Sequence, residues 1–317
     1  MTILCLLLIS GFMLDLNLQD VKLLFERREG GENYDIYLFK RLNDKPIKLT
    51  SNPAYDGHPR WSPDGKKVLF ISQRDGENRF YLIDLESMDL KPLEIPDRWA
   101  WIGRHEWSPD GKRILFSARD MLWGCGSECG LYLLNMSNGK IDRLIKGAFG
   151  PSAWISTRRI LTFSAGKLHI LDMKLGELER FPLPQGIMPI FRISPSPDST
   201  RIVFDGTTPN PRSGGCHEIY LMDLTTGEVI NLTNTLRIAE GSPCWTPDGR
   251  LIFFPREVGK DCWDIFIMTP EGETVGRLEL EGKNFSPDVF DPNYIYSISP
   301  LIDLKRLMWG VIKRGGM

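Results

Sequence analysis

A five-residue phrase recurs along this chain and constrains its fold more strongly than any other feature. Trp-Ser-Pro-Asp-Gly occupies residues 61–65 and 107–111, and Trp-Thr-Pro-Asp-Gly occupies 245–249. Looser copies lie at 154–156 and 195–199, and a short apolar triplet follows each copy. The triplets end at Phe70, Phe116, Thr162, Phe204 and Phe253, which are 46, 46, 42 and 49 residues apart. A period of this length predicts a repeat architecture in which neighbouring units bury one another's apolar surfaces.

The phrase itself has the chemistry of a tight turn between two strands. Proline fixes φ, aspartate accepts hydrogen bonds from the backbone ahead, and glycine adopts the left-handed conformation that closes a hairpin. Tryptophan ends one strand, and β-branched or aromatic residues begin the next. A polar loop, a third strand such as 35–38 or 218–221, and a fourth short strand follow. Four antiparallel strands in each unit of about 45 residues are typical of a β-propeller blade.

The Trp-Ser-Pro-Asp-Gly turns, combined with third strands of the Asp-Ile-Tyr type, resemble the TolB-like β-propeller family over residues 22–292. The resemblance implies an all-β, six-bladed propeller whose ring is closed by three N-terminal strands and one C-terminal strand. Residues 23–25, 35–38 and 46–50 would supply the three strands, and residues 284–292 the fourth.

The two ends of the chain leave an alternative with seven blades. Strand-like runs at 294–296 and 306–312, with the apolar run 3–9 as an outer strand, would form the seventh. We expect six, because the last residues lack the turn chemistry of the other units. The predicted organisation is an apolar N-terminal segment at 1–21, the propeller at 22–292, and a C-terminal strand or tail at 293–317.

The apolar run 3–9 has two interpretations, an export signal and a buried strand. Its length suits the apolar part of a signal peptide, but no Lys or Arg precedes it and no Ala-x-Ala site follows. It is too short to span a membrane as a helix. The first interpretation would place the protein outside the cytoplasm.

The composition allows a large core and argues against one class of partner. The 317 residues are 42% apolar and 10% aromatic, which is ordinary for one all-β domain. The formal net charge is −2, and no basic run exceeds two or three residues. We therefore expect no nucleic-acid partner.

Propeller topology assigns residues to two sides of the molecule. The recurring turns lie on the back, whereas the loops between second and third strands and the connections between blades lie on the front. The front loops vary, and variable loops on a rigid scaffold commonly carry binding. Trp and Arg, which dominate interface energetics, are expected to bind there. The residues are Arg98, Trp99, Trp101, Arg104, Trp123, Arg212 and Trp263. The alternative for each tryptophan is inward packing at the end of a blade.

Five cysteines also fall near the front. Disulfides among them would pin long loops and indicate an oxidising compartment or a thermophilic host. Free thiols and a metal site are the alternatives. The candidates for disulfides are Cys125, Cys129, Cys216, Cys244 and Cys262.

A second candidate site is the mouth of the central funnel, where Asp56, His58, His105 and Glu240 are expected beside Arg104. Two histidines in neighbouring blades would suit a shared metal. Solvated or hydrogen-bonded histidines are the commoner arrangement, so we predict neither a metal nor a cofactor.

These features favour one function and leave one alternative. The chain has no Gly-x-Ser-x-Gly elbow and no phosphate-binding glycine loop. We therefore expect a non-catalytic, monomeric interaction module that docks a protein or peptide partner through its front. The alternative is an enzyme of the polysaccharide lyase or hydrolase type that binds a sugar or small molecule in the funnel, with His58 and His105 as metal ligands or as acid and base.

Overall fold

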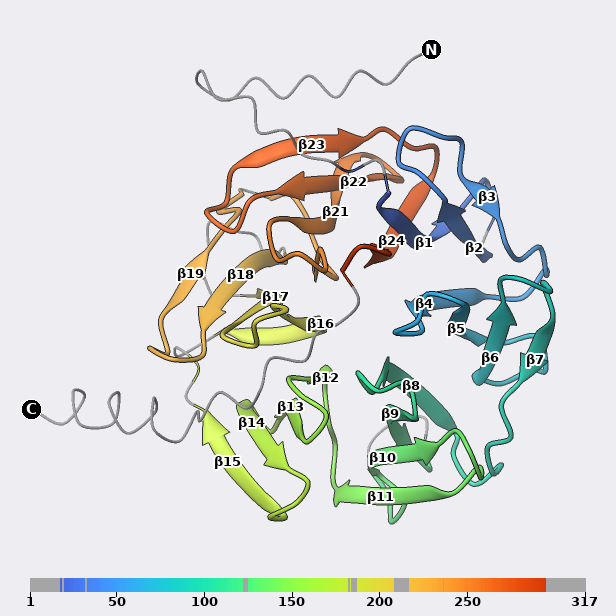
Figure 1. Cartoon of the computed structure of the whole chain (residues 1–317), viewed down its shortest axis with the longest axis vertical. Helices are drawn as coiled ribbons and strands as arrows, with labels where there is room; N and C mark the ends of the chain where they lie inside the picture. Colours follow the sequence, from blue (N-terminus) through green and yellow to red (C-terminus); the bar gives the residue numbers. More distant parts are fainter. Residues whose placement is uncertain are drawn as a thin grey trace, which may run out of the picture. The chain divides into compact units, whose positions relative to one another are not determined.

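The computed structural model of the chain describes residues 18, 20–31, 33–121, 125–181, 183, 187–207, 217–235 and 237–294. Every regular element within these ranges is a β-strand (Figure 1), which confirms the all-β prediction. No described segment forms a helix with the length and apolar character needed to cross a membrane. The described residues form two compact units, 18–95 with 238–294 and 96–237.

The unit 96–237 contains three antiparallel sheets, each built from four consecutive strands. The first sheet consists of β8 (Trp101–Trp107), β9 (Arg113–Arg119), β10 (Gly130–Asn135) and β11 (Ile141–Lys146). The second consists of β12 (Ser152–Trp154), β13 (Arg159–Ser164), β14 (Lys167–Asp172) and β15 (Glu177–Phe181). The third consists of β16 (Met188–Pro195), β17 (Arg201–Thr207), β18 (Glu218–Asp223) and β19 (Val229–Asn231).

The other unit contains one four-stranded sheet and one eight-stranded sheet. The four-stranded sheet consists of β4 (Asp56–Trp61), β5 (Lys67–Ser72), β6 (Arg79–Asp84) and β7 (Leu90–Pro92). One group in the larger sheet is β20 (Cys244–Trp245), β21 (Ile252–Gly259), β22 (Cys262–Met268) and β23 (Thr274–Leu278). The other group is β24 (Lys283–Phe290), β1 (Lys22–Arg28), β2 (Tyr34–Phe39) and β3 (Ile47–Lys48).

The eight-stranded sheet corrects the expected number of separate blades. The structure has four separate four-stranded sheets, not six or seven, because the two remaining groups form a single sheet. A parallel pair between Trp263 and Lys283 joins them, and the side-chain amide of Asn284 donates to the Trp263 carbonyl at 2.7 Å. Residues 295–296, 306–312 and 3–9, assigned to a seventh blade, lie outside the described residues.

The recurring turns are closed by one set of hydrogen bonds. The Ser62 hydroxyl donates to Asp64 at 2.6 Å and accepts from the Lys67 amide at 2.8 Å, while Gly65 has φ of +67°. In the other copies that contain the aspartate, the residue after it also has a left-handed backbone conformation. In one of these copies that residue is Ser199, with φ of +61°. The same hydroxyl–carboxylate bond joins Ser108 to Asp110, Ser196 to Asp198, and Thr246 to Asp248.

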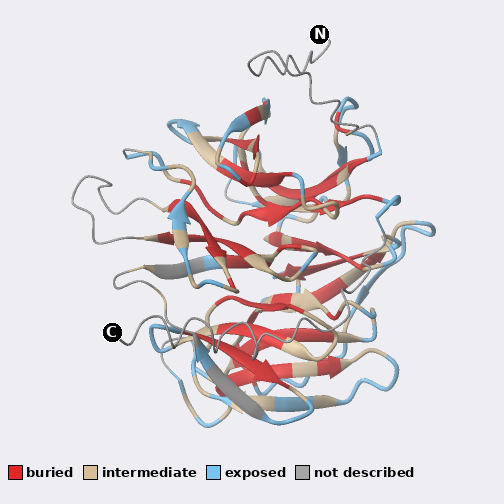
Figure 2. Ribbon diagram, turned by 60° about the vertical axis from the view of Figure 1, so that its left-hand side comes forward, coloured by how far each residue is buried: buried red, intermediate tan, exposed pale blue. Residues whose placement is uncertain are grey.

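Most apolar residues of the second and third strands in each group of four are buried, and they pack against a neighbouring sheet. In one cluster, Leu161 and Ile170 of the β12–β15 sheet pack with Phe204 of the β16–β19 sheet. In the other unit, the rings of Trp61 and Phe290 lie 5.3 Å apart. Figure 2 shows buried residues along the strands and exposed residues in the connecting loops. The repeat therefore forms its core as expected, by stacking sheets that cannot bury their own faces alone.

Several first strands of the sheets bulge at a residue with positive φ. The pairing register shifts between Gly57 and Arg60 in β4 and between Gly103 and Glu106 in β8. Bulges re-aim side chains and are common beside functional sites. The bulge residues with left-handed φ are His58 (54°), Arg104 (49°) and Ser286 (50°).

Candidate functional site

A cavity of about 170 Å³ lies at one end of the β8–β11 sheet. Its walls are the start of β8, the end of β9, the start of β10 and the connection from β11 to β12. These are the segments assigned to the front. We call this space the front cavity, and its main lining side chains are Trp101, Arg104, Ser117, Arg119, Cys129 and Phe149.

Arg119, the last residue of β9, contributes a positively charged side chain to the wall of this cavity. Trp101 lies opposite it in the antiparallel pairing of β8 with β9, so both side chains emerge on one face. The guanidinium carbon of Arg119 lies 4.5 Å from the centre of the Trp101 ring. The residues described by the structure provide this side chain with neither an ion pair nor a hydrogen bond, although its Nε is buried.

Two arginines in the other unit have buried carboxylate partners in comparable places. Arg256 lies opposite Glu240, and its Nε donates to Oε1 at 2.7 Å. Arg74 follows β5 and donates to both oxygens of Asp56, at 3.0 and 3.1 Å. Glu240 is 1% exposed and Asp56 is fully buried. Trp101 therefore occupies, opposite Arg119, the position that a carboxylate occupies opposite Arg256.

A second cation, Arg104, lies at the bulge of β8. Its guanidinium donates to the Phe191 carbonyl at 3.2 Å. Burial lowers the pKa of Arg104 from its usual value, Asp205 opposes this change, and the positive charge of Arg119 adds to it. An arginine remains protonated despite such a shift. The front cavity thus holds two neighbouring positive charges.

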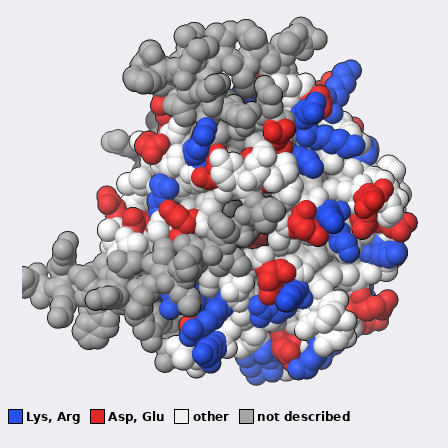
Figure 3. Space-filling model, in the orientation of Figure 1, with Lys and Arg blue, Asp and Glu red and all other residues white. Residues whose placement is uncertain are grey.

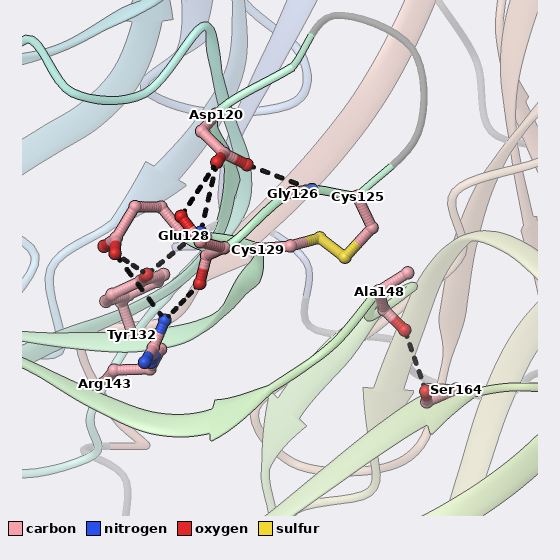
Figure 4. Close-up of a disulfide and its surroundings, with 10 residues drawn as sticks. Asp120, Cys125, Gly126, Glu128, Cys129, Tyr132, Arg143, Ala148 and Ser164 are labelled. Atoms are coloured by element: carbon pink, nitrogen blue, oxygen red, sulfur yellow. Dashed lines mark hydrogen bonds and ion pairs between the residues drawn. A yellow bond between two sulfur atoms is a disulfide. The ribbon is translucent and has the colours of Figure 1, made fainter.

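A short disulfide loop forms one wall of the cavity. Cys125 and Cys129 are bonded, which confirms the disulfide prediction for this pair. Figure 4 shows Asp120 accepting hydrogen bonds from the Gly126 and Glu128 amides, at 3.1 and 3.2 Å. Burial alone would raise the pKa of Asp120, but these backbone bonds outweigh it and lower the pKa. The loop is therefore held in place by a covalent bond and an ionised carboxylate.

The other front residues differ in exposure. Trp99 is 3% exposed and packs edge-on against Tyr132, with ring centres 4.7 Å apart, so it belongs to the core of the sheet. Arg98 covers Trp99 and is 46% exposed at its side chain. Trp263 is half-buried in the other unit, against Phe285. Trp123 and Arg212 lie outside the described residues.

The funnel residues are engaged in structural contacts. His58 donates its amide to Glu26 at 2.6 Å, and its Nδ1 lies 3.1 Å from the Ser286 hydroxyl. Ser286 in turn donates to Glu26 at 2.9 Å. Burial, followed by the charge of Glu26, raises the pKa of Tyr55 well above its usual value. These four residues form a polar cluster between β1, β4 and β24.

The other histidine predicted at the funnel, His105, is buried, with 1% of its surface exposed. Among the described residues, no group of three or more His, Cys, Asp or Glu side chains is arranged to hold a metal ion. On the face drawn in Figure 3, Lys and Arg side chains are interspersed with Asp and Glu.

The structure corrects the disulfide prediction for Cys262, which is a free thiol and is not bonded to Cys244. Cys244 lies opposite Phe253 near one end of β21, and Cys262 lies opposite Gly259 at the other end. Six residues of extended strand span roughly 20 Å, well beyond the ~7 Å Cα separation that a disulfide tolerates. Cys216 lies outside the described residues.

Sequence reasoning missed Arg119, Phe149, Glu26 and Ser286. Arg119 and Arg256 both stand three residues after the end of the apolar triplet, at Phe116 and Phe253. Aligning the repeats would therefore have related the two arginines. It would not have identified the strand partner of Arg119, because the bulge in β8 changes the register. Phe149, Glu26 and Ser286 join their sites through tertiary packing and carry no local signal.

Comparisons with known proteins agree with this fold. A family model described as the TolB beta propeller domain matches residues 20–156. TolB from Acinetobacter baumannii matches with a TM-score of 0.71 and 20% identity, over 86% of this chain and 67% of that chain. A putative TolB from Agrobacterium tumefaciens matches with a TM-score of 0.60 and 18% identity, over 86% of this chain and 97% of that chain. A chain of a nidogen/laminin complex matches with a TM-score of 0.63 and 8% identity, over 86% and 99%.

The comparison with curated proteins finds no match. At identities of 20% and below, the solved structures establish the fold, which is an all-β propeller. The family match over the first repeats and the Trp-Ser-Pro-Asp-Gly turns that it covers agree with that fold. Residues 20–156 therefore resemble the TolB beta propeller family, and the described chain shares the propeller fold of the TolB structures.

Proposed function

We propose that this chain is a non-catalytic interaction module that docks a protein or peptide partner at the front of the β8–β11 sheet. The observation that carries the proposal is the front cavity, where Arg104 and Arg119 lie beside Trp101 and Phe149. Trp and Arg are enriched among the residues that contribute most to binding energy, especially where a pocket surrounds them. A TolB-like propeller also suits a general role in protein interaction.

The surroundings of the cavity support docking. Phe191, whose carbonyl accepts from Arg104, is 51% exposed and offers an aromatic surface beside the cavity. The loop that carries Cys129 is already ordered by its disulfide and by Asp120. A wall that is ordered before binding loses less conformational entropy when a partner arrives.

We also propose that the propeller has six blades and acts as a monomer. This count treats the eight-stranded sheet as two blades, β20–β23 and β24 with β1–β3. β24 then supplies the one C-terminal strand and β1–β3 the three N-terminal strands of a blade that closes the ring, and β1 is antiparallel to β24.

The enzyme alternative draws on one observation, the 3.1 Å contact between Ser286 and His58. A nucleophile and a base need such a contact. However, Ser286 is 2% exposed and its hydroxyl donates a hydrogen bond to Glu26, so a substrate has little access to that hydroxyl. If the enzyme hypothesis were correct, His58→Ala would abolish turnover of a sugar polymer. We favour docking because the front cavity is open to a ligand and the cluster is not.

Peptide display on the immobilised full chain tests the docking function. We expect enriched peptides whose affinity, measured by fluorescence anisotropy, falls about tenfold or more in Arg104→Ala. Lys140→Ala is the control, because Lys140 lies in the turn between β10 and β11, on the back, and is 67% exposed. Peptides that bind both variants equally, or a display that enriches none, would contradict the proposal.

A further inference from the structure

We propose that the front cavity binds a peptide carboxylate, which Arg119 and Arg104 hold between them. This inference rests on the proposed docking function and names the chemical group that is recognised. The carboxylate can come from a Glu or Asp side chain or from the C-terminus of the peptide.

The first argument comes from the sheet that contains Arg119. Arg256 and Arg74 each bind a buried carboxylate, whereas Arg119 lies opposite Trp101. A guanidinium has five N–H donors and no acceptor, and leaving buried donors without partners costs free energy. The Arg119 guanidinium lies over the Trp101 ring, and an aromatic ring offers its N–H donors no carboxylate oxygen. A carboxylate from a ligand would complete the interaction that Glu240 provides for Arg256.

The second argument is electrostatic. Arg104 lines the same cavity, and the positive charge of Arg119 contributes to lowering the pKa of Arg104. Asp205 offsets part of the positive charge at Arg104, and an anion placed between the two guanidinium groups relieves the repulsion that remains. Charge-assisted bonds from arginine to carboxylate are short and often bidentate, so they give geometry as well as affinity.

The third argument concerns the rest of the ligand. Trp101, Phe149 and Cys129 provide apolar surface around the two guanidinium groups. Such walls suit the methylene stem of an amino-acid residue better than a fully hydrated inorganic ion. The volume of about 170 Å³ fits one side chain or one chain end. The partner is therefore a peptide that inserts an acidic group while its flanks contact the neighbouring surface at Phe191.

A set of blocked tripeptides tests the ligand chemistry on the full chain. Acetyl-Ala-Glu-Ala-amide carries only a side-chain carboxylate, and acetyl-Ala-Gln-Ala with a free C-terminus carries only a terminal one. Acetyl-Ala-Gln-Ala-amide carries none. Binding is measured by titration calorimetry, with inorganic phosphate as a separate probe. We expect at least one charged peptide to bind about tenfold or more tightly than the uncharged peptide, and the better of the two identifies the source.

Arg119→Gln should remove this preference for the charged peptide. Arg113→Gln should preserve it, because Arg113 lies at the opposite end of β9 and bonds the Thr157 carbonyl. Equal binding of charged and uncharged peptides, or tighter binding of phosphate than of either carboxylate, would overturn the inference.

A second experiment needs no ligand. Trp101→Glu places a carboxylate opposite Arg119, as Glu240 lies opposite Arg256, and Trp101→Gln is its uncharged match. Both variants lose the same ring. We expect the Tm of Trp101→Glu to exceed that of Trp101→Gln by about 2 °C or more, and the difference to vanish when Arg119→Gln is added. Trp101→Glu should also lose the preference for charged peptides.

The two proposals fail in different ways. Equal Tm values for Trp101→Glu and Trp101→Gln would show that Arg119 does not require a carboxylate, which overturns the inference. If displayed peptides bind the front without any dependence on acidic groups, docking is supported and carboxylate recognition is overturned. If no peptide binds at all, both proposals are wrong.

Discussion

The ring of Phe290 occupies the space that a side chain on Gly65 would need. A methyl carbon on Gly65 would overlap Cζ of Phe290, although β24 and the turn that holds Gly65 are over 200 residues apart in sequence. Gly65 also has φ of +67°. The glycine of the recurring phrase therefore serves two purposes, since it closes its own turn and admits the neighbouring sheet.

This contact predicts a large loss of stability for Gly65→Ala. We expect the free energy of unfolding to fall by about 2–4 kcal/mol, because left-handed strain and overpacking against Phe290 add together. Gly139→Ala is the matched control, since Gly139 has φ of +70° with no atom within 4 Å of the new carbon. It should cost only about 1 kcal/mol. Denaturant titration measures both variants, and equal losses would rule out the packing contribution.

The recurring turns predict a dependence of stability on acid. Burial would raise the pKa of Asp64, but the Ser62 hydroxyl and the Lys66 amide outweigh it and hold the pKa below its usual value. Asp110 and Asp198 show the same balance. A depressed pKa in the folded state contributes stability above the unfolded pKa, and that contribution is lost as the pH falls through the folded pKa. The free energy of unfolding should therefore decline below about pH 4.

Removing the Ser62 hydroxyl tests this origin. Ser62→Ala should destabilise the protein by about 1–2 kcal/mol at neutral pH and weaken the decline in acid, because Asp64 loses a donor that favours its charged form. Ser137→Ala is the control, since the Ser137 hydroxyl bonds the neutral side chain of Asn135. Denaturant midpoints at pH 6 and pH 3.5 give the comparison. If the midpoints of both variants fall by the same amount between these two pH values, the bond from Ser62 to Asp64 is not the origin of the acid dependence.

The buried pair of Asp56 and Arg74 predicts a strong effect of a single truncation. Asp56→Ala leaves the Arg74 guanidinium without its two carboxylate bonds, and breaking a buried pair costs about 3–5 kcal/mol. Asp89→Ala removes a pair with Lys91 in which both side chains are more than 60% exposed, so it should change stability by less than about 1 kcal/mol. Thermal unfolding of the two variants distinguishes them, and similar Tm values would contradict the prediction.

The disulfide predicts a modest effect of reduction. Closing a loop as short as that from Cys125 to Cys129 stabilises a fold by about 2 kcal/mol in the chain-entropy model. The double variant Cys125→Ser with Cys129→Ser should therefore lower the free energy of unfolding by about that amount or less, because Asp120 still holds the loop. Cys262→Ser is the control, since that thiol is free. Mass spectrometry after alkylation without reductant should find Cys125 and Cys129 protected, and labelling of either would disprove the bond.

Part of the site could be predicted because it depends on local order along the chain. Trp101 and Arg104 stand in a connection between repeats, and the topology of antiparallel strands assigns such connections to the front. The sequence could not distinguish Trp99 from Trp101, because a difference of two residues in a connection decides between the core and the cavity wall. Likewise, the spacing of Cys244 and Cys262 says nothing of the strand that separates them.

The amino-acid sequence by itself determined the strands, their antiparallel order and the recurring turns, because proline, aspartate, glycine and β-branched residues act within a few positions of one another. Only the tertiary structure decided that two groups of strands share one sheet and that Arg119 lies opposite Trp101. Those outcomes depend on strand register and on contacts between residues far apart in the chain, which local preferences do not specify.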